Sequence, residues 1–192
     1  KIMHYLVLVI GEDVEGQLEP YYQDLEVDKY LVGEVMDYDK EYMLKHYAER
    51  GETFQDFDEC YAKHGHDWNY NQYEKGSDGK WYEYSTFNPN AEWDWYQIGG
   101  RWAGRIKVKE GVGFTKPEFS WGWSEDAKAK ILEERRTDSA RIRDIDNLDE
   151  LKMCYAVVMD YEWIGGVTED EVEKILKDLD PSTRITFVDC HM

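Results

Sequence analysis

The sequence is short of several residue types, and each shortage excludes a class of protein. It holds 3 cysteines in 192 residues, too few for a disulfide framework, and the odd number leaves at least one thiol unpaired. The longest apolar stretch, residues 5–10, has the length of a strand, whereas a membrane span needs about 20 apolar residues. The first residues have no signal-peptide pattern, so we expect a cytoplasmic protein with no membrane attachment.

Positive charge is also scarce. Lys and Arg number 23 against 42 Asp and Glu, which gives a formal net charge of -19. Duplex DNA and anionic lipids repel such a chain, so we expect no direct binding to duplex DNA. The acidity has two interpretations that stay open: a solvated surface, or a mimic of nucleic acid that occupies a basic host protein.

Apolar and aromatic residues are plentiful. Hydrophobic residues make up 42% of the chain and aromatic residues 15%, a composition that supports a buried core and argues against disorder. The length favours a single domain, residues 1–192.

The hydrophobic pattern predicts both strands and helices. Apolar or alternating runs predict strands at 3–10, 105–109, 153–159 and 184–189, and a hairpin over 67–87 that turns at 75–79. Helical spacing or capping residues predict helices at 39–49, from Thr53 to Gly65, at 124–136 with Ser124 as cap, and between the capping box Thr168/Glu171 and Asp180. This pattern indicates an α+β fold, a mainly antiparallel sheet with helices packed on one side.

The segment 93–105 is the strongest candidate for a ligand site. Gly99 and Gly100 favour positive φ and amides that converge on an anion, while Arg101 and Arg105 offer bidentate donors to a phosphate. The predicted ligand-binding residues also include the rings that would stack on a base, namely Trp95, Tyr96 and Trp102. The alternative interpretation is a β-bulge whose tryptophans lie in the core and whose arginines are neutralised by the acidic surface.

Metal ligation and catalysis have weaker sequence support. Two groups of metal-binding residue types occur, Cys60/His64/His66 and Asp189/Cys190/His191, together with the carboxylates Asp144 and Asp146, but none has the spacing of a known zinc site. Cys190 and His191 are adjacent on a predicted strand, so they point to opposite faces and cannot form a catalytic dyad. We therefore assign no catalytic residue and no cofactor, favour a non-enzymatic protein, and leave the metal question open.

The central motif at residues 88–102, the run Arg143-Asp144-Ile145-Asp146 and the ending Val188-Asp189-Cys190-His191 resemble a family of small accessory proteins of tailed bacteriophages and prophages. The family members carry a longer insertion rich in tryptophan and glycine after Asp160, where this chain has only residues 161–166. The resemblance implies a counter-defence protein in the cytoplasm of an infected bacterium. It implies no particular activity.

Three hypotheses follow. The first is a binding protein that sequesters a small nucleotide-like anion through segment 93–105. The alternative is an acidic inhibitor of a host nucleic-acid-binding or defence protein complex, acting like an anti-CRISPR protein or a DNA mimic. The second alternative is a metal-dependent hydrolase that uses Asp189 and His191.

Overall fold

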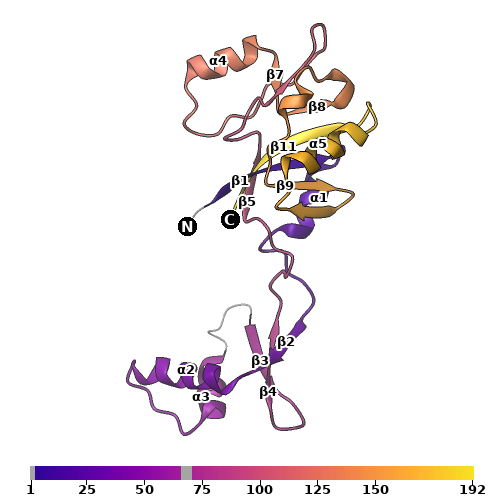
Figure 1. Cartoon of the computed structure of the whole chain (residues 1–192). Coiled ribbons are helices and arrows are strands. Elements are labelled where there is room, and N and C mark those ends of the chain that lie inside the picture. Colours follow the sequence, from indigo (N-terminus) through magenta and orange to yellow (C-terminus); the bar gives the residue numbers. More distant parts are fainter. Residues whose placement is uncertain (1–2, 66–70) are drawn as a thin grey trace. The chain divides into compact units, whose positions relative to one another are not determined.

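The computed structural model of the protein describes residues 3–65 and 71–192 (Figure 1). The chain divides into two compact units: unit 1 comprises Lys1–Gln23 and Asn90–Met192, and unit 2 comprises Asp24–Pro89. The second of these units, Asp24–Pro89, has a hydrophobic core of its own.

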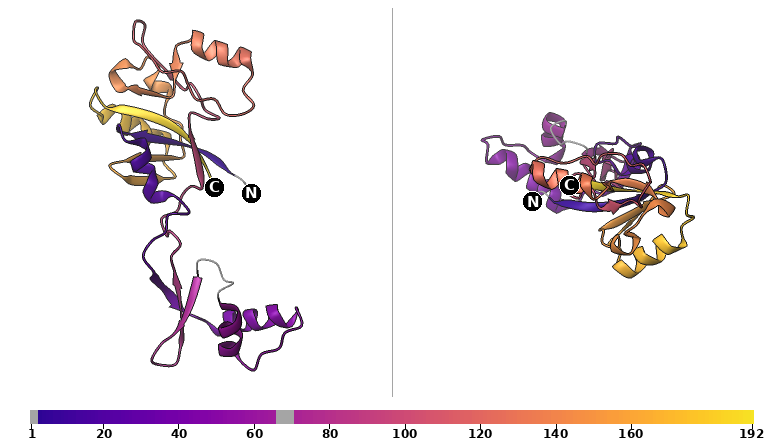
Figure 2. Two further views of the ribbon diagram at one scale, coloured as in Figure 1. Left: turned by 180° about the vertical axis from the view of Figure 1, so that it is seen from behind. Right: turned by 90° about the horizontal axis from the view of Figure 1, so that it is seen from above.

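Unit 1 is built on a mixed, mostly antiparallel sheet in the order β10-β9-β1-β11-β5, with β8 also paired to β11. β1 pairs in parallel with β9 and antiparallel with β11. The strands are β1 (His4–Ile10), β5 (Trp95–Ile98), β8 (Ser139–Arg141), β9 (Ala156–Met159), β10 (Glu162–Gly165) and β11 (Arg184–His191). The start of β1 and the end of β11 lie side by side in Figure 1 and in both views of Figure 2, because His4 and His191 are cross-strand partners.

Alternation along β1 separates two apolar layers. Leu6, Leu8 and Ile10 belong to one core, whereas Val7 and Val9 belong to the other. Helix α5 (Glu169–Asp178) buries Val172 and Leu176 in the first core, and the short helix α1 (Val14–Leu18) buries Leu18 in the second. The longer of these helices therefore covers one face of the sheet, as expected, and the short α1 lies on the other.

The remaining elements of unit 1 lie outside this sheet, and Ile106 from one of them belongs to the first core. β6 (Ile106–Lys107) pairs with β7 (Arg136–Thr137), and α4 (Glu125–Glu133) immediately precedes β7. Three short 3-10 helices complete the unit: η1 (Glu19–Tyr21), η3 (Ile142–Asp144) and η4 (Leu148–Glu150).

Unit 2 contains a three-stranded antiparallel sheet and two helices. The sheet has the order β2-β4-β3, formed by β2 (Tyr30–Glu34), β4 (Trp81–Ser85) and β3 (Asn71–Lys75). Helices α2 (Asp37–Ala48) and α3 (Phe57–His64) contribute to a small core of Val35, Met43, Tyr47, Phe57 and Cys60. An internal core of this kind is why the segment forms a compact unit.

The α+β fold with mostly antiparallel sheets is confirmed, and most predicted elements occur near their expected positions. The predicted start of the second helix is wrong: Asp56, not Thr53, caps α3 by accepting a hydrogen bond from the Glu59 N–H at 3.0 Å. The hairpin turns where expected, although its predicted residues 67–70 lie outside the described residues. No helix in the described ranges is both long and apolar enough to cross a bilayer.

Candidate functional site

The turn that follows β5 requires glycine at two successive positions. Gly99 has φ +70° and Gly100 has φ +57°, both in the left-handed region. A Cβ on Gly99 would lie 2.3 Å from Oδ2 of Asp138, and a Cβ on Gly100 would lie 2.6 Å from the side chain of Asp189. The turn therefore packs closely against two carboxylates, and a larger residue at Gly99 or Gly100 would displace them.

Asp138 holds the turn from one side. Its Oδ1 accepts the N–H of Gly104 at 2.7 Å, and its Oδ2 accepts the N–H of Glu118 at 2.7 Å. The side chain is buried, and this burial raises the pKa of the carboxyl group, while the two backbone hydrogen bonds oppose the shift. The backbone carbonyl of Asp138 accepts the N–H of Phe187 at 2.9 Å, so Asp138 joins these two loop segments to β11.

Asp189 holds the turn from the other side. It is fully buried, its Oδ2 accepts the N–H of Arg101 at 3.0 Å, and its Oδ1 lies 2.8 Å from Nδ1 of His4. One carboxylate thus connects the glycine turn to the first residue of β1.

The anion nest predicted at Gly99 and Gly100 does not form. The Gly99 N–H donates to the carbonyl of Phe187 at 2.9 Å, and the Gly100 N–H donates to the carbonyl of Glu118 at 2.8 Å. The turn has the positive φ angles that the sequence indicated, but its amides are used to attach it to neighbouring backbone. The amides of the turn therefore donate to oxygen atoms of the protein itself.

The aromatic residues predicted to stack on one ligand do not converge. Trp95 is half exposed beside His4, with ring centroids 6.3 Å apart. Tyr96 packs perpendicular to Trp93 in the second core, with centroids 4.9 Å apart, whereas Trp102 packs against the first core. The three predicted rings therefore form no single stacking platform, and the core location that the alternative interpretation gives to the tryptophans applies to Trp93 and Trp102.

Tyr96 does line a pocket of about 360 Å³, but its surroundings have the wrong charge for an anion. Beside Tyr96, Tyr22 and Trp93, the lining includes three acidic residues, Asp13, Glu15 and Glu19. The carboxylates of these three residues would repel a phosphate bound in this pocket.

The two predicted arginines differ in environment. Arg101 has an exposed side chain, whereas the Arg105 guanidinium lies over the ring of Phe187 at 5.4 Å from its centroid. Burial lowers the pKa of Arg105, and its buried Nε has no hydrogen-bond partner among the described residues. Arg105 also lines a pocket of about 170 Å³ with Arg136, Asn147, Glu150 and Leu151, so the wall of this pocket combines two cationic residues with one acidic residue.

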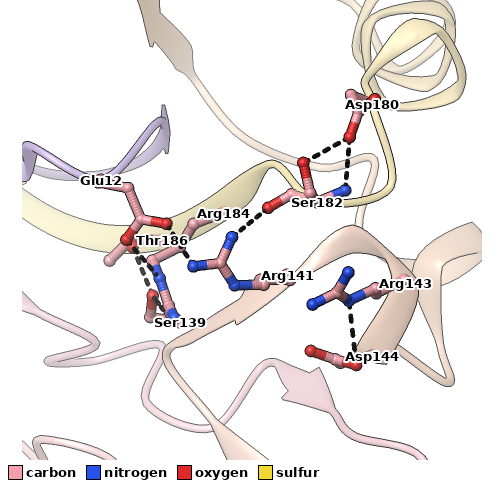
Figure 3. Close-up of polar contacts among 9 residues, drawn as sticks. All are labelled: Glu12, Ser139, Arg141, Arg143, Asp144, Asp180, Ser182, Arg184 and Thr186. Carbon is pink, nitrogen blue, oxygen red and sulfur yellow. Dashed lines mark hydrogen bonds and ion pairs between the residues drawn. The ribbon is translucent and has the colours of Figure 1, made fainter.

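A second arginine pair, which the sequence did not reveal, lies at the edge of the main sheet. Arg141 on β8 and Arg184 on β11 are cross-strand partners, and both guanidinium groups converge on Glu12 (Figure 3). Arg141 Nη2 lies 2.9 Å from Glu12 Oε1, and Arg184 Nε lies 2.9 Å from Glu12 Oε2. Two cations therefore share one carboxylate.

Further hydrogen bonds fix the orientation of this arginine pair. Arg141 Nη1 donates to the carbonyl of Ser182 at 2.6 Å, and Arg184 Nη1 donates to Ser139 Oγ at 3.3 Å. The Thr186 hydroxyl donates to the same Ser139 Oγ at 2.8 Å (Figure 3). Arg141 and Arg184 are among the residues that line a pocket of about 330 Å³, whose wall also contains Phe114, Thr115 and Asp144. We call this hollow the arginine pocket.

The predicted metal-binding groups are not assembled as clusters. Within residues 3–65 and 71–192, no three His, Cys, Asp or Glu side chains are placed to hold one metal ion. Cys60 is buried, His64 Nε2 lies 3.0 Å from Glu52 Oε2, and the structure does not describe His66. Cys190 is buried in the second core, on the face of β11 opposite to Asp189 and His191, as strand alternation predicted.

The chain matches no model of a protein family, no curated protein and no solved structure. The resemblance to bacteriophage accessory proteins therefore stays a prediction.

Proposed function

We propose that the protein is a non-enzymatic binding protein that captures a small nucleotide-like anion in the arginine pocket. One observation carries the proposal: Arg141 and Arg184 project from neighbouring strands and already hold a carboxylate at 2.9 Å from each guanidinium. The proposal keeps the class of ligand expected from the sequence and moves the site from segment 93–105 to the edge of β11.

The charge balance of the pair supports an anionic ligand. Like charges directly opposite on two strands destabilise a sheet unless they are compensated. Glu12 supplies one negative charge for two positive ones, and Asp144, the carboxylate in the pocket wall, lies 4.0 Å from the Nε of a third arginine, Arg143. One positive charge therefore remains uncompensated among these groups, in a chain whose formal net charge is -19. A phosphate monoester carries about -1.5 to -2 charges at neutral pH and several acceptor oxygens, and it therefore complements two guanidinium groups better than one carboxylate does.

The Glu12 side chain can move away from the two arginines when such a ligand binds. Its side chain is 61% exposed, so a swing into solvent would leave no buried charge behind. The incoming anion would then take the two guanidinium contacts that Glu12 makes, with the Ser139 hydroxyl beside it. Glu12 thus acts as an internal competitor for the ligand.

The size of the pocket limits the ligand. At about 330 Å³ it stands at the lower end of the roughly 300–1,000 Å³ found for small-molecule sites, so a sugar phosphate or mononucleotide fits better than a dinucleotide. Phe114 supplies an apolar wall, and Asp144 disfavours a second phosphate on its side of the pocket.

We further propose that this capture serves counter-defence, by lowering the free concentration of a nucleotide that the host uses. This step depends only on the resemblance of residues 88–102 to bacteriophage proteins.

Calorimetry with inorganic phosphate and with adenosine monophosphate as probes tests the proposal. Arg184→Met removes one guanidinium and should weaken binding about tenfold or more, since hydrogen bonds to charged groups contribute about 1.5–3 kcal/mol. Lys45→Met is the matched control, because Lys45 is exposed on α2 in unit 2. Equal affinity in the two variants would refute the site.

Glu12→Gln gives a test in the opposite direction. It removes the competing charge and keeps the shape of the side chain, so phosphate should bind more tightly than to the unaltered protein. The control is Glu133→Gln, which removes an exposed charge on α4. If both glutamine variants raise affinity equally, the gain comes from net charge and not from the arginine pocket.

A further inference from the structure

Two histidines face each other at the end of the main sheet of unit 1. His4 on β1 and His191 on β11 are cross-strand partners, and their ring centroids lie 4.9 Å apart with an interplanar angle of 69°. Their side chains are 15% and 21% exposed, so solvent reaches both rings. The fixed register of the two strands keeps this pair together.

Each ring is held through the same nitrogen by its own carboxylate. His4 Nδ1 lies 2.8 Å from Asp189 Oδ1, and His191 Nδ1 lies 2.7 Å from Asp94 Oδ1. An ionised carboxylate only accepts hydrogen bonds, so each neutral ring carries its proton on Nδ1 and a lone pair on Nε2. A carboxylate behind the donor nitrogen is the arrangement that orients histidine ligands in metal sites.

We propose that Nε2 of His4 and Nε2 of His191 bind one divalent transition-metal ion of the Zn²⁺ type. Two imidazoles bound to one tetrahedral ion at about 2.0–2.1 Å have ring centres about 5 Å apart. The ring centroids of His4 and His191, 4.9 Å apart, have a separation compatible with this value.

The site would be open, with two protein ligands. No third His, Cys, Asp or Glu side chain in the described part of the chain completes a closed cluster, so water or an added small ligand fills the remaining positions. Asp189 and Asp94 act as positioning residues behind the rings. The order of affinities among ions should follow the usual preference of imidazole sites, with Cu²⁺ above Zn²⁺.

Trp95 provides a reporter for the ion. It is the cross-strand partner of His191, and its half-exposed indole lies 6.3 Å from the His4 ring. A Cu²⁺ ion bound between the histidines should quench Trp95 fluorescence, and Trp95→Phe should remove that part of the quenching.

The experiment titrates the whole chain with Zn²⁺ by calorimetry and with Cu²⁺ by fluorescence. His4→Ala and His191→Ala should each lower the affinity at least tenfold, and the double variant should lose little more, because both rings share one ion. Asp94→Asn should cost about 10–100-fold, the usual effect of losing such a positioning partner. His46→Ala, on α2 of unit 2, is the matched control and should leave binding unchanged.

Two results would overturn the inference. One is Zn²⁺ affinity in His4→Ala and His191→Ala equal to that of His46→Ala. The other is an unaltered chain that takes up no ion at a hundred micromolar Zn²⁺ or Cu²⁺. Far-ultraviolet circular dichroism verifies the fold of each variant, and Asp94→Asn tests the same site with both ligating rings retained.

Discussion

Gly99→Ala probes the glycine turn more directly than any other single change. A Cβ at this position meets Asp138 Oδ2 at 2.3 Å, well inside van der Waals contact, and φ is +70°. The methyl group cannot turn away, and Asp138 has a buried side chain that holds two backbone N–H groups. The substitution therefore forces either the backbone or the carboxylate to move.

The expected cost has two parts. An alanine in the left-handed region costs about 1–2 kcal/mol. Displacing Asp138 breaks its hydrogen bonds to the N–H groups of Gly104 and Glu118, and hydrogen bonds to a charged group contribute about 1.5–3 kcal/mol each. Together these give a loss of about 4–8 kcal/mol, a large share of the about 5–15 kcal/mol that stabilises a typical domain.

Substitutions at two other glycines distinguish the backbone cost from the cost of displacing Asp138. Gly111 has φ +81° with no atom near its Cβ position, so Gly111→Ala measures the backbone cost alone. Gly113 has an ordinary φ and equally open space, so Gly113→Ala should leave stability unchanged or raise it by about 0.4–1 kcal/mol. Urea unfolding followed by tryptophan fluorescence reports mainly on unit 1, which contains six of the eight tryptophans.

The losses in free energy of unfolding in the three variants, compared with one another, test whether Asp138 is a fixed support of the turn. We expect Gly99→Ala to lose several kcal/mol more than Gly111→Ala, or to remain unfolded where Gly111→Ala folds. A loss in Gly99→Ala no larger than in Gly111→Ala would refute the role of Asp138 as a fixed support of the turn.

Three further predictions concern unit 1. Lys152 and Lys177 hold the pKa of Glu173 at about 2, below its ordinary 4.5, so the folded state binds fewer protons than the unfolded state between these pH values. The stabilisation from this ionised carboxylate is complete above pH 4.5 and is lost as the pH falls towards 2. Glu173→Gln should therefore make the free energy of unfolding depend less steeply on pH in that range. Burial raises the pKa of the Cys154 thiol to about 12, so a thiol reagent at pH 8 should label Cys154 much more slowly than a free thiol, and labelling as fast as that of a free thiol would contradict this. Thr168→Ala removes the cap of α5 and should cost about 0.5–2 kcal/mol in urea unfolding, whereas Thr168→Ser should keep most of it.

The sequence predicted those parts of the fold that short segments determine. The capping box at Thr168 and Glu171, the apolar run of β1 and the glycine turn of the hairpin depend on residues within a few positions of one another. The cap of α3 shows the limit of such local reasoning. Thr53 and Asp56 are both good capping residues, and burial of Phe57 at the first helical position accompanies the choice of Asp56.

The candidate sites depend on strand register, which no local pattern reveals. Arg141 and Arg184 become neighbours only through the pairing of β8 with β11, and His4 and His191 only through that of β1 with β11. The turn shows the same limit, because the sequence indicated positive φ at Gly99 correctly, but the carboxylate against it comes from Asp138 on a distant segment. Residue types indicate which chemistry a chain could carry, and strand pairing decides which groups meet.

The two proposed sites stand at opposite ends of β11. Arg184 and His191 are seven residues apart, which corresponds to about 23 Å along an extended strand. This distance exceeds the Debye length of about 8 Å at physiological ionic strength, so the charge of a ligand at one end has little effect at the other. The strand between them is buried in the two cores, so neither end can shift without disturbing the packing of Phe187 and Val188. The proposed anion capture and the proposed metal binding should therefore be independent of each other, and a variant at either end serves as a folded control for the other.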